Sequence, residues 1–289
     1  MNQFEISLSG SLDLDRCMSS GQVFRWVQDG SCWIGVDNRF RFRMSVAGDR
    51  LSISTDSTED HVRRLLNLDF DDTEASGRVI AAEPVFSQLI PPLRGLRMMQ
   101  PDDPVETFFC FLCTANNHLK RIGPMCQKLG QYGEPLEGGQ FAFPSAERIS
   151  QIPEESLRAQ GFGYRAATIR IAAEEIVSRG GDAYLLALKQ AGYREAFGEL
   201  LSIPFVGRKL ADCICLFGLH FGEAVPIDTH LWQAAVREFF PQYRGQPLTD
   251  LRYRIVGDFF RDRFGKLAGW AHQRLYVDNL LRPRQRTAV

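Results

Sequence analysis

The segment IPFVGRKLADCICL, residues 203–216, places a lysine where its charge is poorly matched to the backbone. A Pro-plus-Gly turn precedes apolar residues at helical spacing, so we expect a helix to begin near Arg208. The first turn of a helix favours acidic side chains, because its N–H groups carry partial positive charge. A second cation there disfavours the charged form of Lys209, and a neutral amine is a nucleophile. A solvated surface lysine is the plainer alternative.

The two cations also fit an anion site. Helices expected over 193–201 and 208–219 are joined by SIPFVG, a hairpin that turns its backbone N–H groups outward beside the positive end of the second helix. A DNA phosphate fits such a site, with Gly207 and Arg208 at the start of the helix contributing to its binding.

A carboxylate follows one helix and one loop later, at Asp228 in VPIDTHLW. Its position immediately before THLWQAAVREFF predicts the N-cap of a helix. A carboxylate held at a helix start is fixed, ionised and oriented, which also suits stabilisation of a developing cation. The chain distance would let Asp228 and Lys209 converge.

Two kinds of element must position these side chains. Residues 1–55 read as an antiparallel meander of QVFRWVQ, CWIGV, RFRFRMSV and RLSIST, separated by turn signals at 29–30, 37–38 and 48–49. RFRFRMSV alternates apolar residues with arginines, which is typical of a sheet with one solvated face. From His61 onward the apolar period is helical. The expected helices are 59–67, 76–90, 104–115, 118–131, 145–151, 154–160, 165–179, 182–191, 193–201, 208–219, 229–240, 249–264 and 266–281.

These patterns predict an α+β protein. A small N-terminal antiparallel β-sheet domain is expected over residues 1–75, and an all-helical domain containing the helix-hairpin-helix motif over residues 76–289.

The bulk composition is that of a globular protein, with 44% hydrophobic and 24% charged residues. No apolar run approaches the ~20 residues of a membrane span, and the N-terminus lacks the pattern of a signal peptide. The seven cysteines favour reduced thiols over a disulfide framework, and their close pairs lack the partners of a metal site. The net charge of −1 means that a DNA-binding protein must concentrate its cations locally.

Several segments together resemble one family. IPFVGRKLADCICL followed by AVPIDTHLW is similar to the helix-hairpin-helix DNA glycosylase superfamily, named for this hairpin, a Gly/Pro-rich loop and an aspartate. SGQVFRW (20–26), CTANNHLKRI (113–122), GFGYRA (161–166) and GWAHQRLY (269–276) resemble its 8-oxoguanine DNA glycosylase/AP lyase branch, in the same order. The resemblance covers nearly the whole chain, and the joint match is specific, which a lone hairpin is not.

Members of this branch flip a damaged base out of duplex DNA, because the glycosidic bond is not accessible in the stack. The resemblance implies that Lys209 attacks C1′ of the sugar and forms a Schiff base, while Asp228 supports the oxocarbenium-like charge. Monofunctional relatives lack the lysine and activate water instead. The lysine therefore implies β-elimination of the strand as well as base excision.

The resemblance also implies a base pocket. Gly21 matches a glycine whose carbonyl accepts from N7–H of 8-oxoguanine, a donor that guanine lacks; a plain turn is the alternative. Cys213 and Tyr276 match the residues that pack on the two faces of the flipped base. His272 stands where the family has a glutamine that reads the Watson–Crick edge. Core packing is the alternative for the cysteine and the tyrosine.

A second set of residues matches DNA contacts. Asn116, Arg121 and Arg165 match residues that fill the vacated space and read the orphaned cytosine, whose acceptors need donors. Tyr164 matches the wedge that props the DNA kink, and His230 matches a residue near the 5′ phosphate. A helix end, surface arginines and a histidine beside a helix cap are the plainer alternatives.

The chain departs from the family pattern at four positions. Phe205 stands where the hairpin usually has its first glycine, and His118 replaces a third asparagine. His272 replaces the glutamine of the family, and Tyr276 replaces a phenylalanine.

The predicted function is base-excision repair by a bifunctional glycosylase/lyase that removes 8-oxoguanine opposite cytosine. Two alternatives stay open. One is a glycosylase for another damaged base, such as an alkylated purine, which Lys209 argues against. The other is a non-catalytic helix-hairpin-helix DNA-binding protein, in which Lys209 is a phosphate contact and Asp228 a cap. We expect a monomer that binds duplex DNA containing a damaged base, without metal, cofactor or membrane, in the cytoplasm at the nucleoid.

Overall fold

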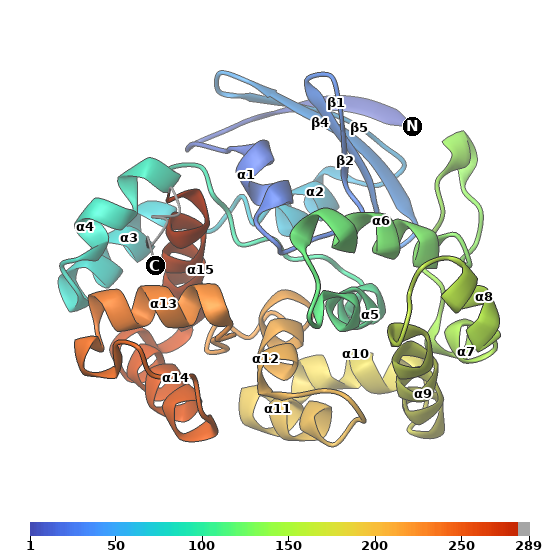
Figure 1. Ribbon diagram of the computed structural model, residues 1–289. Helices are drawn as coiled ribbons and strands as arrows, with labels where there is room; N and C mark the ends of the chain where they lie inside the picture. The colour runs from blue at the N-terminus through green and yellow to red at the C-terminus, as the bar shows by residue number, and fades with distance from the viewer. Residues whose placement is uncertain (283–289) are drawn as a thin grey trace. The chain divides into compact units, whose positions relative to one another are not determined.

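The structure is a computed structural model that describes residues 1–282 (Figure 1). It confirms the predicted fold class, since an N-terminal antiparallel sheet of five strands precedes a series of helices. The strands are β1 (Asn2–Ser7), β2 (Val27–Asp29), β3 (Cys32–Asp37), β4 (Phe40–Ala47) and β5 (Arg50–Thr55). The α-helices are α1 (Leu14–Ser19), α2 (Glu59–Leu65), α3 (Asp72–Ala82), α4 (Phe86–Leu89), α5 (Pro104–Thr114), α6 (Leu119–Gly130), α7 (Ala146–Ser150), α8 (Glu154–Ala159), α9 (Arg165–Ser178), α10 (Asp182–Ala191), α11 (Tyr193–Leu201), α12 (Arg208–Phe217), α13 (Thr229–Glu238), α14 (Asp250–Phe264) and α15 (Ala268–Leu281). Short 3-10 turns are η1 (Pro91–Leu93), η2 (Glu137–Gly139), η3 (Pro241–Tyr243) and η4 (Gly265–Leu267).

The chain forms two compact units. The first comprises Met1–Phe70 and Gly95–Phe221, and the second comprises Asp71–Arg94 and the described residues from Gly222 onward. The expected division at residues 75/76 differs from this grouping, because the sheet is joined to helices from the middle of the chain. Buried Arg25 shows this: its guanidinium pairs with Glu106 of α5 at 2.7 Å and donates to the carbonyl of Phe141 at 2.9 Å.

The sheet of the first unit has the strand order β1-β5-β4-β3-β2, and all pairs are antiparallel. Phe42 and Met44 of β4 are fully buried, in a core shared with α1 and α2. The arginines of β4 and its flank occupy the opposite face, where they pair with acidic residues at the surface, as Arg43 does with Asp29 at 2.8 Å. The predicted alternation is confirmed, and these surface pairs contribute little individually.

Two expectations for the N-terminal segment are wrong. Within QVFRWVQ only Val27 and Gln28 belong to a strand, because the polar side chain of Gln22 replaces strand pairing. Its amide donates to the carbonyl of Arg97 at 3.0 Å and accepts from the N–H of Met99 at 2.9 Å. Residues 14–19, read as part of the meander, form α1, which Asp13 caps by accepting from the N–H of Arg16.

The helix expected over 76–90 is two helices, α3 and α4. Asp71 caps α3 by accepting from the N–H groups of Thr73 and Glu74, which moves its start earlier than expected. Pro84 follows the end of α3, and a proline cannot continue a helical hydrogen-bond ladder. The apolar period alone did not reveal this break.

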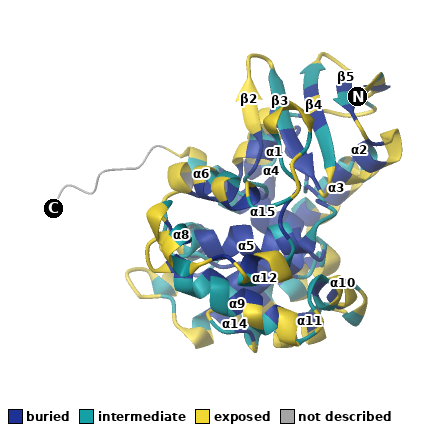
Figure 2. Cartoon of the chain, turned by 90° about the vertical axis from the view of Figure 1, so that its right-hand side faces the viewer, coloured by how far each residue is buried: buried dark blue, intermediate teal, exposed yellow. Residues whose placement is uncertain are grey.

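Helix α5 lies at the centre of the first unit and packs against α6, α9, α10 and α12. Nearly all of its residues are buried, as Figure 2 shows. Asp103 caps it by accepting from the N–H groups of Val105 and Glu106, and Pro104 occupies its first turn. The position of α5 matters for the site, because its last turn carries Phe111 and Thr114.

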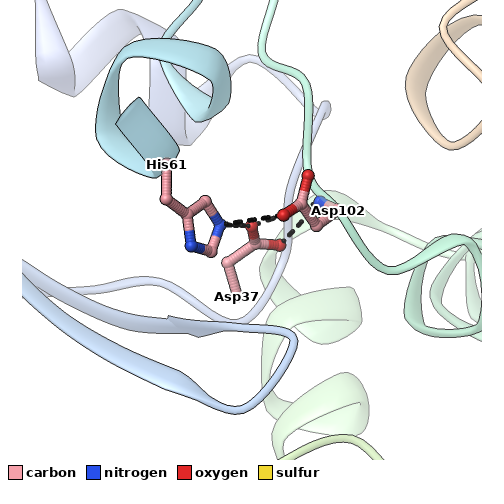
Figure 3. Close-up of side chains that lie close together, drawn as sticks. All are labelled: Asp37, His61 and Asp102. Carbon is pink, nitrogen blue, oxygen red and sulfur yellow. Dashed lines mark hydrogen bonds and ion pairs between the residues drawn. The ribbon is translucent and has the colours of Figure 1, made fainter. Parts of the chain in front are cut away.

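A buried polar cluster ties the sheet to the segment before α5 (Figure 3). Nε2 of His61, on α2, lies 2.7 Å from Oδ2 of Asp37 at the end of β3 and 3.3 Å from Oδ2 of Asp102. Its Nδ1 lies 2.7 Å from Oγ of Ser57. These groups are of the kind that ligate metals, but the short bond to Asp37 occupies the nitrogen that a cation would need. We therefore assign the cluster a structural role.

His220, just after α12, predicts an acid-side loss of stability. Its Nε2 donates to the carbonyl of Pro101 at 3.0 Å, and burial lowers its pKa to about 4. Between pH 6.5 and 4 the unfolded state binds a proton that the folded state does not, so stability falls as the pH falls. We expect a loss of at most about 2 kcal/mol between pH 6.5 and pH 5 from this group.

His220→Asn is the variant for this test, because asparagine tolerates the positive φ of 64° at this position. Denaturant unfolding between pH 5 and pH 7 should show a shallower dependence on pH in the variant than in the wild type. Parallel pH curves would mean that another group causes the acid-side loss.

In the second unit, an ion pair of buried Arg274 joins α15 to α3. Arg274 lies 2.6 Å from Oδ1 of Asp72 on α3, and the same oxygen accepts from the indole N–H of Trp270 at 2.9 Å. The Arg274 guanidinium stacks on the Trp270 ring at 3.2 Å from its centroid. This network fixes the helix that carries His272 and Tyr276. None of the described helices combines the length and the apolar character that a membrane span requires.

Candidate active site

Helix α12 begins at Arg208, as predicted, and carries Lys209 in its first turn. Gly207 is the N-cap and offers no side-chain hydrogen bond to the turn, which contains no acidic residue. The helix start is thus a cationic, backbone-lined end, as expected for anion binding.

The amine of Lys209 rests on the end of α5. Its Nζ lies 3.4 Å from Oγ1 of Thr114 and 5.5 Å from the centroid of the Phe111 ring. The Thr114 hydroxyl donates to the carbonyl of Phe111 at 2.7 Å, so its oxygen is the acceptor toward Lys209. Within the described part of its unit, no carboxylate forms an ion pair with Lys209. Lys209 is half-buried, and the two contacts of its amine are long.

Cys213 lies one turn after Lys209 on α12, on the same face, and is buried. Among the described residues, none of the seven cysteines forms a disulfide. Burial raises the pKa of the Cys110 thiol and holds the pKa of Cys126 and of Cys215 well above the usual value. These three thiols are therefore poor nucleophiles.

The hairpin before α12 keeps a glycine-like backbone without the glycine. Phe205 has a φ of 67°, in the left-handed region, and its side chain is 58% exposed. Ile203 and Val206 on either side of it are buried, and the N–H of Val206 donates to the carbonyl of Ile203 at 3.2 Å. The turn is thus closed by its apolar residues, while the phenylalanine ring points to solvent.

Asp228 caps α13 in the second unit, as predicted. Its Oδ1 accepts from the N–H of Leu231 at 2.8 Å. Among the described residues no hydrogen bond engages the second carboxylate oxygen, and the residue is half-buried. One oxygen therefore orients the group, and the described hydrogen bonds leave the other oxygen unused.

Three rings of the second unit lie together. The His272 ring stacks on Tyr276 with centroids 6.0 Å apart and planes 12° apart, and His230 meets Tyr276 edge-on at 6.1 Å. His272 is buried, whereas Tyr276 and His230 are half-buried. The structure thus brings together the predicted base-stacking residue, the predicted edge reader and the predicted phosphate contact. Gln273, the neighbour of His272 on α15, is also buried.

Three of the predicted DNA contacts converge at the end of α5. Buried Arg165 donates to the carbonyls of Ala115 and Asn116, the latter at 2.9 Å, and its guanidinium lies 4.5 Å from the centroid of the Tyr164 ring. The hydroxyl of Tyr164 donates to the carbonyl of Ala115 at 3.1 Å. Asn116 is exposed, with a φ of 47°. Arg121, a further predicted DNA contact, is exposed on α6, and no described contact joins it to this group.

Gly21 follows α1 and has a φ of 78°, a conformation that favours glycine. It is half-buried beside Gln22, whose side-chain bonds hold this turn in place.

Comparison with known proteins identifies the family. Residues 5–108 match the model of the 8-oxoguanine DNA glycosylase N-terminal domain, and residues 109–247 match that of the HhH-GPD superfamily base excision DNA repair proteins. The N-glycosylase/DNA lyase OGG1 of Arabidopsis thaliana is 35% identical over 294 residues, which cover 96% of this chain and 80% of that protein. The chain belongs to the N-glycosylase/DNA lyase family.

Solved structures share the fold of this glycosylase/lyase. A structure of MBOgg1 in complex with a low-affinity DNA ligand has a TM-score of 0.86 at 24% identity, covering 97% of this chain and 96% of that chain. The Clostridium acetobutylicum 8-oxoguanine glycosylase/lyase in complex with double-stranded DNA has a TM-score of 0.81 at 23% identity, covering 94% of this chain and 96% of that chain. These likenesses show the fold, and the family match confirms the predicted bifunctional glycosylase/lyase activity.

Sequence reasoning missed the partners of the glycosylase/lyase's central lysine. Thr114 and Phe111 lie about 95 residues before Lys209 in the chain, and no local pattern links them. Thr114 does belong to CTANNHLKRI, one of the segments that resembled the family, which was the available signal. Gln22 likewise lies in SGQVFRW, where its side-chain role in holding the turn had no periodic signature.

Proposed function

We propose that this glycosylase/lyase removes 8-oxoguanine opposite cytosine from duplex DNA, with Lys209 as the nucleophile and Asp228 as the stabilising carboxylate. The observation that carries the proposal is the amine of Lys209, set in the first turn of α12 against Thr114 and Phe111 without a carboxylate partner among the described residues of its unit. A family of N-glycosylase/DNA lyases requires an amine nucleophile, and this lysine meets the requirement.

The chemistry follows from an amine at a sugar carbon. Nζ of Lys209 bonds to C1′ while the glycosidic bond breaks and its electron pair leaves with the base. The sugar passes through an oxocarbenium-like state, which the negative charge of the Asp228 carboxylate stabilises. Loss of an N–H proton and opening of the sugar ring give the Schiff base. Removal of a proton from C2′ then expels the 3′ phosphate, which cleaves the strand.

The remaining roles extend this proposal. The carbonyl of Gly21 accepts from N7–H of the oxidised base, and Cys213 and Tyr276 cover its two faces. The ring of His272 beside Tyr276 reads the Watson–Crick edge. Asn116, Arg121 and Arg165 read the orphaned cytosine, with Tyr164 as the wedge. Gly207, Arg208 and His230 contact phosphates.

The test is single-turnover excision with borohydride trapping. Duplexes carrying 8-oxoguanine, 3-methyladenine or no lesion, each opposite the matching pyrimidine, are incubated with the enzyme at one stated salt concentration. We expect excision and a covalent adduct with the 8-oxoguanine duplex. Excision of 3-methyladenine without an adduct would instead support the alkylated-base alternative, and no reaction would support the non-catalytic alternative.

Arg165→Ala should relax discrimination between cytosine and adenine opposite the lesion, by about tenfold or more. In the structure its guanidinium donates hydrogen bonds to the carbonyls of Ala115 and Asn116, beside the proposed position of the orphaned base. Excision rates are measured on both duplexes. Arg165→Lys is the matched control, because lysine keeps the positive charge but lacks the planar guanidinium that donates to two acceptors. An equal fall in rate on the two duplexes would assign Arg165 to phosphate contact.

We further propose that the enzyme acts as a monomer, in the cytoplasm at the nucleoid. Seven cysteines outside any disulfide support a reducing compartment. Flipping one base into one pocket needs a single chain. Light scattering of the free protein and of its complex with a short duplex tests the stoichiometry.

A further inference from the structure

Phe205 has a backbone conformation that phenylalanine rarely adopts. Its φ of 67° brings Cβ close to the following carbonyl oxygen, which makes a bulky residue there a true outlier. The family hairpin usually has a glycine at this place, and glycine adopts the conformation without strain. The chain therefore bears a cost at this position that a single substitution to glycine removes.

The ring does not offset this cost by packing. Phe205 is 58% exposed, and it is the one exposed phenylalanine among the 21 of the chain, all of which lie within the described residues. The neighbouring side chains Ile203 and Val206 point inward and close the turn without it. Folding therefore does not explain the phenylalanine.

The location of the ring suggests what covers it. Phe205 is two residues before Gly207, the N-cap of α12, whose first turn has two cations and no capping side chain. A DNA phosphate at this helix end is bonded on either side to a deoxyribose. The C–H face of that sugar is the apolar part of the nucleic-acid backbone, and an exposed ring beside the phosphate site is placed to meet it.

We propose that Phe205 is a DNA-contact residue, whose ring packs against the deoxyribose next to the phosphate bound by the hairpin. The inference rests on the proposed function, because it uses the hairpin as the phosphate site. It adds a contact that is apolar and independent of sequence. It also accounts for the retained backbone strain, since the left-handed conformation turns the ring away from the protein core and toward the bound DNA strand.

Two variants separate the effect of the Phe205 ring from the effect of its strained backbone conformation. Phe205→Gly removes both the ring and the strain, and Phe205→Asn removes the ring while tolerating the left-handed conformation. We expect both to bind a duplex with an abasic-site analogue opposite cytosine about tenfold more weakly, the factor that follows from roughly 55 Å² of apolar surface left in water. Phe205→Gly should also raise the melting temperature by about 1–4 °C.

The salt dependence of binding identifies the kind of contact. A lost sugar contact leaves the slope of log affinity against log salt unchanged, whereas a lost phosphate contact lowers it by about one. Phe205→Tyr should retain wild-type affinity, because the ring remains. Val27→Ala, which trims a side chain of similar exposure on β2, serves as the control for loss of any surface apolar group.

Wild-type affinity in both Phe205→Gly and Phe205→Asn would overturn the proposal, as would a lowered salt slope. A failure of this kind is distinguishable from failure of the proposed function. Borohydride trapping at saturating DNA depends on Lys209, so it should persist in every Phe205 variant.

Discussion

Lys209→Gln is expected to abolish both borohydride trapping and strand cleavage on an 8-oxoguanine:cytosine duplex. Glutamine has a similar length and a polar end, so contact with Thr114 at the end of α5 can persist. It has no amine, so neither the bond to C1′ nor the Schiff base can form. Binding of the lesion duplex should fall only a few-fold, because the phosphate contacts come mainly from the hairpin backbone. Trapping yield, strand cleavage and affinity are measured at the same salt concentration.

Arg208→Gln is the matched control, since it removes the neighbouring cation from the same helical turn. This variant should bind DNA more weakly, with a lower salt slope, yet it should still be trapped at saturating DNA. Trapping of Lys209→Gln at the wild-type yield would contradict the assignment of Lys209 as the nucleophile. Loss of trapping in both variants with intact DNA binding would show that the charge of the turn, not the amine, is required.

Two helix starts at the site were predictable from local sequence, whereas the capped starts of α1 and α3 were not. Asp228 before α13 and Gly207 before α12 are local signals, and both helices begin where the sequence placed them. The N-terminal segment was less predictable, because its structure depends on distant groups. Gln22 bonds to backbone atoms of Arg97 and Met99, and Arg25 to Glu106, so no local period could reveal that this segment is not a strand.

The site residues differ in the same way in how far local sequence predicts them. The charge anomaly of Lys209 and the cap at Asp228 could be read from local sequence. The pocket and the DNA contacts came from the family resemblance, and their roles stay predictions. Neither source predicted the hydrogen bonds between distant segments. Examples are the bond from Lys209 to Thr114 and the bonds from Arg165 to the carbonyls of Ala115 and Asn116. Such contacts depend on tertiary packing, which a pattern within one segment does not encode.

Phe205 shows a different limit. The residue type argued against a glycine-like turn, yet the structure has the left-handed conformation at that position. The buried neighbours Ile203 and Val206 hold the turn closed, and tertiary packing therefore overrides the local preference of phenylalanine.

Asp228→Asn should lower single-turnover excision by about a hundredfold or more, while leaving thermal stability nearly unchanged. The two roles of the residue use different properties. Capping needs only an oxygen that accepts from the N–H of Leu231, and asparagine supplies one as well as aspartate does. Stabilisation of the oxocarbenium-like sugar needs negative charge, which asparagine lacks.

Asp228→Ala separates the two effects further. It loses the cap as well as the charge, so it should be as inactive as Asp228→Asn and also less stable, by about 0.5–2 kcal/mol. Excision is followed at saturating enzyme, and stability by denaturant unfolding at the same pH. If Asp228→Asn turns over like the wild type and only Asp228→Ala is impaired, Asp228 is a helix cap alone. The charge that stabilises the sugar must then come from another group.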